Sequence, residues 1–329
     1  MPRLPLAALL GALALLPAAC RSRAERGAEA PGAATSRPPA PFDWSRPAAS
    51  LAMDAGEVAA RLGPFEWEAT ATWTVVKASD PEHPIHVSER HLLRQQAKGA
   101  FRVSTELDPG TWQGAETGRT LVFDGARTFA RGRWSPAGGA FRARPNDRGE
   151  EARRHREESF GLAEQVARLC GPALELAPAG ELRVLARAAR RYELRLGAAR
   201  PSPATPPAGL SSDDDTRRRL GLLEGRVPQA LEGELVADAE TGAPLAVHLR
   251  ATFGTRDDPG VRVDLSLDAA VTGVGDRVPA VQAPAKLAPE PKAHGVARAL
   301  EAVGLRKKGE PPAERAEPGE PEPAEPEAP

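Results

Sequence analysis

The chain is poor in the residues that build several common kinds of site. Its 329 residues include two cysteines, two methionines and one tyrosine, and aromatic residues make up 4% of it. Cys20 and Cys170 could form at most one disulfide, which excludes a disulfide-stapled scaffold. So few aromatic rings, with a net charge of −1, argue against base-stacking platforms and a basic field. We therefore expect no nucleic-acid partner.

The common catalytic motifs are also missing. Gly-x-Ser-x-Gly, His-Glu-x-x-His and Gly-x-x-x-x-Gly-Lys do not occur, so hydrolase, metalloprotease and phosphate-loop functions lose their usual signals. His83, His86 and His91 form the one histidine cluster. His91 stands an odd number of positions after His86 and should face the other side of a strand, whereas metal ligands must converge. We interpret these histidines as exposed and unliganded, and predict no enzyme activity, metal or cofactor.

An acidic triplet, Asp213–Asp215, is the other candidate for binding a cation. Three adjacent acids do not match a calcium-binding loop, which spaces its ligands and contains a glycine. Ser212 before the acids and Arg217–Arg219 after them fit the start of a helix, with acids near the positive end of its dipole. We favour the helix start.

The longest apolar run lies at the N-terminus and is too short to span a membrane. Leu4–Leu16 is almost entirely Leu and Ala, whereas a spanning helix needs about 20 apolar residues. Arg3 precedes the run, and the small residues Ala18 and Ala19 follow it. A positive head, an apolar core and small residues at a cleavage site are typical of a secretory signal. We predict that residues 1–19 are that signal.

Leu16-Pro17-Ala18-Ala19-Cys20 resembles the lipobox of bacterial lipoproteins. The resemblance implies that Cys20 receives a diacylglycerol, that the signal is cleaved before it, and that a fatty acid such as palmitate acylates the new amine. Pro17 departs from the family, which has Leu three residues before the Cys; a plain secreted protein is the alternative. Two or three acyl chains hold a membrane more firmly than one.

The resemblance also implies a location in the bacterial cell envelope. Arg21 follows the Cys in place of the Asp that resembles an inner-membrane retention signal in enteric bacteria. We expect an outer-membrane anchor with the protein facing the periplasm.

Composition divides the rest of the chain into four parts. Residues 20–41 carry the lipid-bearing Cys20 and a Pro-, Gly- and Ala-rich tether that buries too little surface to fold. Residues 42–278 have the size of one β-rich domain. Residues 279–309 are a linker with a short helix at 296–303, and 310–329 are a Pro- and Glu-rich disordered tail.

The central part is dominated by alternating apolar and polar residues. The clearest stretch begins at Phe65 and Trp67, and every second residue as far as Val75 is apolar. Such alternation is typical of antiparallel strands with one solvated face. Further predicted strands lie at 85–95, 101–107, 120–123, 127–130, 181–187, 191–196, 231–237, 245–251 and 261–271. A helix across 181–196 is the alternative there, because Ala, Leu and Arg are good helix formers.

Turn and helix signals complete the pattern. Residues 79–84 read as a turn, and Asp124-Gly125 suits a two-residue hairpin turn. Short helices are predicted within 49–62 and at 160–170, where Cys170 falls on the apolar side as a buried structural thiol. Residues 142–156 are charged throughout and should form a loop or a solvated helix. The expected fold class is mainly β with a few helices (α+β): a curved antiparallel half-barrel sheet covered by short helices.

This arrangement resembles the superfamily of half-barrels that includes the periplasmic lipoprotein carrier LolA, LppX and RseB. The shared elements are a helix before a long Trp-bearing strand, the hairpin at Asp124-Gly125, and Asp238 with Thr241-Gly242-x-Pro244 between two strands. The resemblance covers residues 50–275 and implies a hollow face that binds acyl chains, without catalytic residues. The charged segment 142–156 and the Pro-rich insertion after residue 200 depart from it.

We therefore expect a membrane-anchored lipoprotein that binds a lipid, an acyl chain or a lipidated protein on the concave face of the sheet. The residues expected to line the site are Trp67, Trp73, Val75, Phe101, Val103, Phe123, Val263, Leu265 and Leu267. The alternative is a non-catalytic envelope scaffold or sensor that docks a periplasmic protein partner through loops such as 142–156.

Overall fold

One open antiparallel sheet carries the fold. The computed structural model describes residues 39–108, 118–132, 139–144, 147, 149–199, 201, 225–256 and 258–289. The described strands are β1 (Phe65–Lys77), β2 (Asp80–Gln95), β3 (Phe101–Asp108), β4 (Gly118–Phe123), β5 (Thr128–Gly132), β6 (Arg142–Arg144), β7 (Leu174–Val184), β8 (Arg187–Leu196), β9 (Arg226–Asp238), β10 (Pro244–Thr255) and β11 (Val261–Val274). They form an eleven-stranded sheet in the order β6-β5-β4-β3-β2-β1-β11-β10-β9-β8-β7. The first and last strands therefore pair at its centre.

The predicted alternation sets the two faces of the sheet. In β1, Phe65 and each second residue to Val75 are buried, while the residues between them are exposed or half-buried. Pairing with β2 and β11 keeps this phase, because Trp73 lies opposite Val87 on one side and Leu265 on the other. We call the side of the sheet that carries Trp73 the inward face and the opposite side the outer face.

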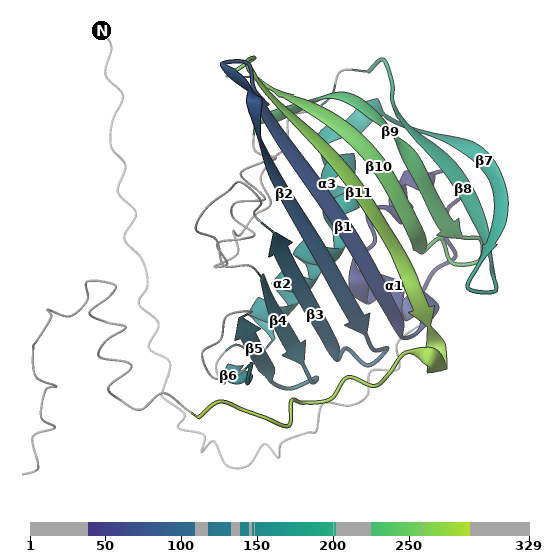
Figure 1. Ribbon diagram of the computed structural model, residues 1–329. Helices are drawn as coiled ribbons and strands as arrows, with labels where there is room; N and C mark the ends of the chain where they lie inside the picture. Colours follow the sequence, from purple (N-terminus) through teal and green to yellow (C-terminus); the bar gives the residue numbers. More distant parts are fainter. Residues whose placement is uncertain are drawn as a thin grey trace, which may run out of the picture. The chain divides into compact units, whose positions relative to one another are not determined.

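Short helices cover the inward face. They are α1 (Ala55–Leu62), α2 (Glu150–Phe160) and α3 (Leu162–Cys170), with 3-10 turns η1 (Pro47–Ser50), η2 (Gly171–Ala173) and η3 (Gly275–Arg277). Figure 1 shows the three helices together on one side of the sheet. Helix α2 packs on β2, β3 and β4, and α3 packs on β9. The expected fold class, a mainly β sheet covered by short helices, is confirmed.

Helix α1 begins and ends where its sequence predicts. Asp54 caps it by accepting a hydrogen bond from the backbone N–H of Glu57 at 2.7 Å. Gly63 ends it with a φ of +81°, a conformation that glycine adopts readily. Val58 and Leu62 are buried on its apolar side.

Several local predictions were wrong. The turn expected at 79–84 is shorter, because β2 already begins at Asp80. The hairpin at Asp124-Gly125 has a four-residue loop, since Phe123 pairs with Thr128 and the Asp124 carboxylate accepts from the N–H groups of Ala126 and Arg127. A carboxylate that satisfies two loop amides favours this wider turn. The helix alternative for 181–196 is excluded by the pairing of β7 with β8.

The charged segment 142–156 is neither a loop nor a solvated helix. Its start forms edge strand β6 and its end the first part of α2. His155 and Arg156 are buried, because the sheet beneath them offers polar partners.

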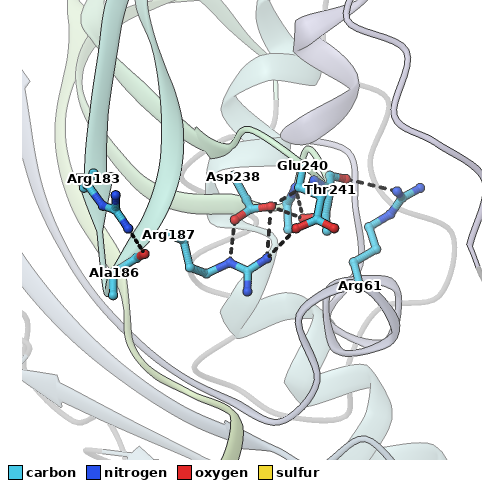
Figure 2. Close-up of polar contacts among 8 residues, drawn as sticks. Arg61, Arg183, Ala186, Arg187, Asp238, Glu240 and Thr241 are labelled. Carbon is cyan, nitrogen blue, oxygen red and sulfur yellow. Dashed lines mark hydrogen bonds and ion pairs between the residues drawn. The ribbon is translucent and has the colours of Figure 1, made fainter.

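A polar cluster at the β9–β10 turn fastens α1 to the sheet (Figure 2). Asp238 accepts hydrogen bonds from the Thr241 backbone N–H at 2.9 Å, the Thr241 hydroxyl at 2.8 Å and the Arg187 Nε at 2.5 Å. Arg61 of α1 donates to the Thr241 carbonyl at 3.0 Å and to the Ala40 carbonyl at 3.1 Å. The β9–β10 turn, which is one of the elements of the family resemblance, thus connects α1 to the sheet.

The segments at the two ends of the described chain pack against this body. Phe42 lies over Gly242, where a Cβ would sit 2.0 Å from the ring, so this close approach requires glycine. At the other end, Ala288 donates its N–H to the Phe141 carbonyl at 2.7 Å, and Val281 packs on a small cluster of Val122, Phe129 and Phe141. The first residues of the linker, 279–289, thus cover this small apolar cluster and the backbone of Phe141.

Several predictions fall outside the described residues. They are the signal at 1–19, Cys20 and most of its tether, the acidic triplet Asp213–Asp215, the helix at 296–303 and the tail at 310–329. Among the residues that are described, no helix has both the length and the apolar character to cross a membrane.

Candidate functional site

The predicted lining residues gather on the inward face. Register places Val75 opposite Val263, Trp73 opposite Leu265, and Phe101 opposite Phe123. All nine side chains are buried, with Phe123 the most exposed at 8%. The residues that we expected to line a ligand site therefore form one continuous apolar surface in the core.

Two donors on this surface lack a partner. The indole Nε1 atoms of Trp67 and Trp73 are buried and make no hydrogen bond. Buried tryptophan N–H groups usually find an acceptor, and each exception calls for an explanation. The indoles stand six residues apart on one strand, which corresponds to about 20 Å. Between them the same face carries only the small side chains of Ala69 and Ala71.

Next to the apolar surface lies a polar row that we did not predict. His91 of β2 pairs with Thr105 of β3, which pairs with Arg119 of β4. Glu89 and Gln95 of β2 share the inward side and are buried at 4% and 1%. The inward face of β2, β3 and β4 therefore carries polar side chains beside apolar ones such as Phe101, and both kinds lie beneath α2.

Helix α2 completes the polar row with His155 and Ser159. The Thr105 Oγ1 lies 3.0 Å from His155 Nε2, 3.3 Å from Ser159 Oγ and 3.3 Å from His91 Nδ1. His91 Nε2 lies 2.9 Å from a Glu89 carboxylate oxygen, and Arg119 lies 3.2 Å from His155 Nδ1. One hydroxyl thus joins two imidazoles in the core.

The interpretation of the histidines was partly wrong. His86 is exposed and His91 is 1% exposed, so the two face opposite sides of β2 as predicted, but His91 is not a surface residue. The sequence pattern of β2 could have indicated a buried His91, because the inward positions of this strand include Glu89, His91 and Gln95 and so break the apolar pattern. Among the described residues, no three His, Cys, Asp or Glu side chains are placed to hold a metal ion.

A second set of polar contacts joins α2 to its surroundings. Arg156 donates to the Gln95 side-chain oxygen at 3.0 Å and stacks over Phe101 at 4.7 Å. Glu157 accepts the N–H of Ala55, the first residue of α1, at 3.1 Å. Burial raises the pKa of Glu157, and this effect outweighs the opposing pull of Arg156 and the Ala55 N–H. The hydrogen bond between Ala55 and Glu157 therefore connects the start of α1 to α2.

Cys170 is inert in this fold. It is fully buried at the end of α3, and burial raises the pKa of its thiol to about 11. The thiolate, which is the reactive form, is therefore scarce at neutral pH.

The outer face has shallow grooves with charged rims. Three of them, of about 440, 420 and 400 Å³, are lined by outward side chains such as Glu66, Arg102, Glu232, Arg250 and Asp268. Cross-strand pairs such as Arg94 with Glu66, at 2.7 Å, occupy this surface. It suits contact with water rather than with an apolar ligand.

Comparison with known proteins gives similarities of fold only. No family model matches the chain, and neither does any curated protein. A LolA superfamily protein from Nitrosomonas europaea aligns at 10% identity over 70% of this chain and 96% of its own, with a TM-score of 0.22. A DUF1329 family protein from Desulfovibrio piger aligns at 10% identity over 68% and 96%, with a TM-score of 0.21. Lipovitellin aligns at 8% identity over 71% of this chain and 28% of its own, with a TM-score of 0.27.

The LolA superfamily, which the turns and strands of this chain resemble, is thus among the families of the aligned structures.

Proposed function

We propose that this chain is a membrane-anchored lipoprotein of the bacterial envelope that binds a lipid, an acyl chain or a lipidated protein on the inward face of its sheet. The observation that carries the proposal is the pair of buried, unpartnered indole N–H groups of Trp67 and Trp73 on an otherwise apolar surface. Ligand sites for apolar molecules combine such surfaces with a few well-placed polar groups.

The spacing of the donors suits an amphiphile with an acyl chain. One leaflet of a bilayer has a hydrocarbon thickness of about 15 Å, half of the ~30 Å core. Once the face is open, a chain of that length would lie along β1 over Ala69 and Ala71, between Trp67 and Trp73, whose Cα atoms are about 20 Å apart. The carbonyl oxygens of an ester or a carboxylic acid would accept the free indole N–H groups.

Binding requires the face to open. The nine predicted residues are buried in the structure, so an entering chain must separate the helices from the sheet. The proposed anchor at Cys20 would keep this opening near a membrane, where such ligands are concentrated.

The test compares the full chain with a variant carrying both Trp67→Phe and Trp73→Phe. The two phenylalanines keep the apolar contact and remove both donors. Radiolabelled palmitate should bind the wild type. Because its one carboxyl group can reach only one of the two indoles, binding should weaken about twofold to tenfold in the double variant. Trp44→Phe is the matched control, because Trp44 stacks on Tyr192 away from β1 and should bind palmitate normally.

Two results would contradict the proposal. Wild-type protein that binds no palmitate and yields no lipid on solvent extraction excludes a lipid site. Equal affinity in the wild type and the double variant excludes the role of the indoles. The anchor is tested separately: Cys20→Ser should move the protein from the membrane fraction to the soluble fraction.

A further inference from the structure

The outer face between β2 and β5 carries arginine side chains on neighbouring strands. Arg94 of β2 lies directly opposite Arg102 of β3, and Arg131 lies two strands further along, on β5. Like charges directly opposite one another destabilise a pair of strands. The fold nevertheless keeps these guanidinium groups on one part of the face, which concentrates positive charge there.

Arg131 belongs to the same face as Arg102. Its guanidinium carbon lies 4.8 Å from the centre of the Phe141 ring, and Phe141 packs with Val122, which is opposite Arg102 in the sheet. The Gly139 carbonyl accepts a hydrogen bond from Arg131 at 3.3 Å. In the part of the chain that the structure describes, no carboxylate pairs with Arg131.

Arg102 has two cationic neighbours and no acidic partner. Its guanidinium group makes no hydrogen bond or ion pair with any residue in the described ranges. Loss of hydration lowers the pKa of Arg102, and the positive charges of Arg131 and Arg94 lower it further. The side chain is still exposed enough for a ligand to reach it. Arg102 is thus a free bidentate donor in a positive field.

The acidic side chains of this area do not compensate Arg102. Glu66 and Glu68 line a groove with it, and each is already bound by an arginine of β2, at 2.7 and 2.8 Å. The outward acids of β3 itself are Glu106 and Asp108, four and six residues from Arg102. A strand rises about 3.3 Å per residue, so these two acids lie about 13 Å or more away along the strand.

A pair of hydroxyl groups lies beside Arg102, on the side toward Arg131. Ser104 Oγ and Thr120 Oγ1 are 2.5 Å apart, and Thr120 is opposite Arg131 in the sheet. Only one of the two hydroxyls can donate to the other, so the second keeps its hydrogen for another acceptor. Ser104 also lines the groove of about 420 Å³ that contains Arg102. Guanidinium and hydroxyl donors thus lie together without a matching acceptor among the described residues.

We propose that Arg102, Arg131 and the hydroxyl pair of Ser104 and Thr120 bind a phosphate group on the outer face of the sheet. A phosphate has several oxygens that accept hydrogen bonds, and the fork of a guanidinium group matches two of them. Its negative charge would offset the repulsion between Arg102 and the neighbouring arginines. A phospholipid headgroup and a small soluble phosphate present the same oxygens, so either can supply the group. The site lies on the face opposite the proposed lipid site and does not depend on it.

The test uses the full chain carrying Cys20→Ser, the parent chain, so that no acyl anchor contributes to vesicle binding. Two probes separate the sources of phosphate. Inorganic phosphate is followed by calorimetric titration, and vesicles of phosphatidylcholine with or without phosphatidic acid are followed by flotation. Arg102→Gln, which removes both the charge and the fork, should weaken binding by about fivefold, the upper range for one exposed ion pair.

Arg250→Gln in the same parent chain is the matched control. It removes the same charge from an exposed position of the outer face, where Arg250 faces Glu232 at 4.0 Å. It should therefore bind both probes like the parent chain, whereas a general loss of positive charge would weaken both variants equally.

The outcomes decide between the sources and test the site itself. Weakened binding of both probes in Arg102→Gln supports a site that accepts phosphate on either carrier. A loss confined to inorganic phosphate supports a site for a soluble phosphate, and a loss confined to vesicles with phosphatidic acid supports a headgroup site. A parent chain that binds neither probe, or equal weakening in Arg102→Gln and Arg250→Gln, would overturn the proposal.

Urea unfolding checks that the variants fold. Arg102→Gln should be at least as stable as the parent chain, because it removes the like charge opposite Arg94. Arg131→Gln is the second variant, and it should weaken binding by a similar factor even if Arg102→Gln does not fold. Unchanged affinity in Arg131→Gln refutes a site built on the two guanidinium groups.

Discussion

At the scale of single residues, Asp238 is a buried carboxylate that accepts hydrogen bonds from both Arg187 and Thr241. It is 1% exposed, lies beside Arg187 and holds the β9–β10 turn through Thr241. Burial raises the pKa of Asp238, but the hydrogen bonds from Arg187 and Thr241 outweigh burial and keep the pKa below its ordinary value. The charged form is therefore the one that the fold favours.

Replacing this carboxylate tests that conclusion. Asp238→Asn should lower the free energy of unfolding by about 1.5–3 kcal/mol, the usual worth of a hydrogen bond to a charged group, as measured in urea at pH 7. Asp264→Asn, which removes the charge facing the exposed Arg262 and leaves an oxygen for the Thr252 hydroxyl, should change it by less than about 0.5 kcal/mol.

The effect of Asp238→Asn on the free energy of unfolding should also depend on pH. Because the folded pKa of Asp238 lies below the ordinary value of 3.8, its contribution to stability is complete above pH 3.8 and is lost as pH falls through the folded value. The difference in free energy of unfolding between the wild type and Asp238→Asn should therefore become smaller in acid. A difference that is constant down to pH 2 would show that the charge is irrelevant.

At the scale of elements, the hairpin of β7 and β8 turns through two strained residues. Val184 pairs with Arg187, so Leu185 and Ala186 alone make the turn, with φ values of +52° and +65°. This left-handed turn is ordinarily built from Asn and Gly. Leu185 gains contact with the core in return, whereas Ala186 is exposed.

Glycine at position 186 should relieve the strain. Ala186→Gly should raise the free energy of unfolding by about 0.5–1 kcal/mol, because a left-handed L-residue costs roughly 1–2 kcal/mol and the flexibility of glycine offsets part of that gain. Ala188→Gly, two residues along in β8, should instead lower it by about 0.5–1 kcal/mol. Thermal unfolding of both variants tests this prediction. A change in melting temperature of the same sign in both variants would contradict the idea that the turn is strained.

Elements were predictable where one face of a segment is apolar, and were missed where both faces are polar. The strand at 65–75 and the helix ending at Cys170 followed from periodicity alone. Helix α2 was not assigned as a packed element, because its buried side carries His155 and Ser159, which a hydrophobic pattern does not register. The polar row of the candidate site was missed for the same reason.

At the scale of the whole molecule, the end of the described chain protects one edge of the sheet. Lys286 accepts the Phe141 N–H at 3.3 Å, and Ala288 donates to the Phe141 carbonyl, which pairs the backbone beside β6. Val281 also covers the cluster of Val122 and Phe129 on the outer face. An uncovered edge and an apolar patch together favour association between molecules.

Two truncations on either side of residues 279–289 should therefore differ in their effect on association. A chain ending at Pro289 keeps the cover and should remain monodisperse in size-exclusion chromatography. A chain ending at Val278 loses it and should aggregate or bind a hydrophobic dye. If both truncated chains behave alike, residues 279–289 have no protective role.

The pairing of β1 with β11 has a consequence for how the protein is made. These strands align from Phe65 opposite Val274 to Lys77 opposite Val261, so the seam of the sheet joins residues that are synthesised nearly 200 positions apart. Contacts so distant in sequence form slowly, and none of them exists before the last strand has left the ribosome. The centre of the sheet can therefore close only after β11 has been synthesised, whereas hairpins such as β2–β3 and β7–β8 are complete earlier.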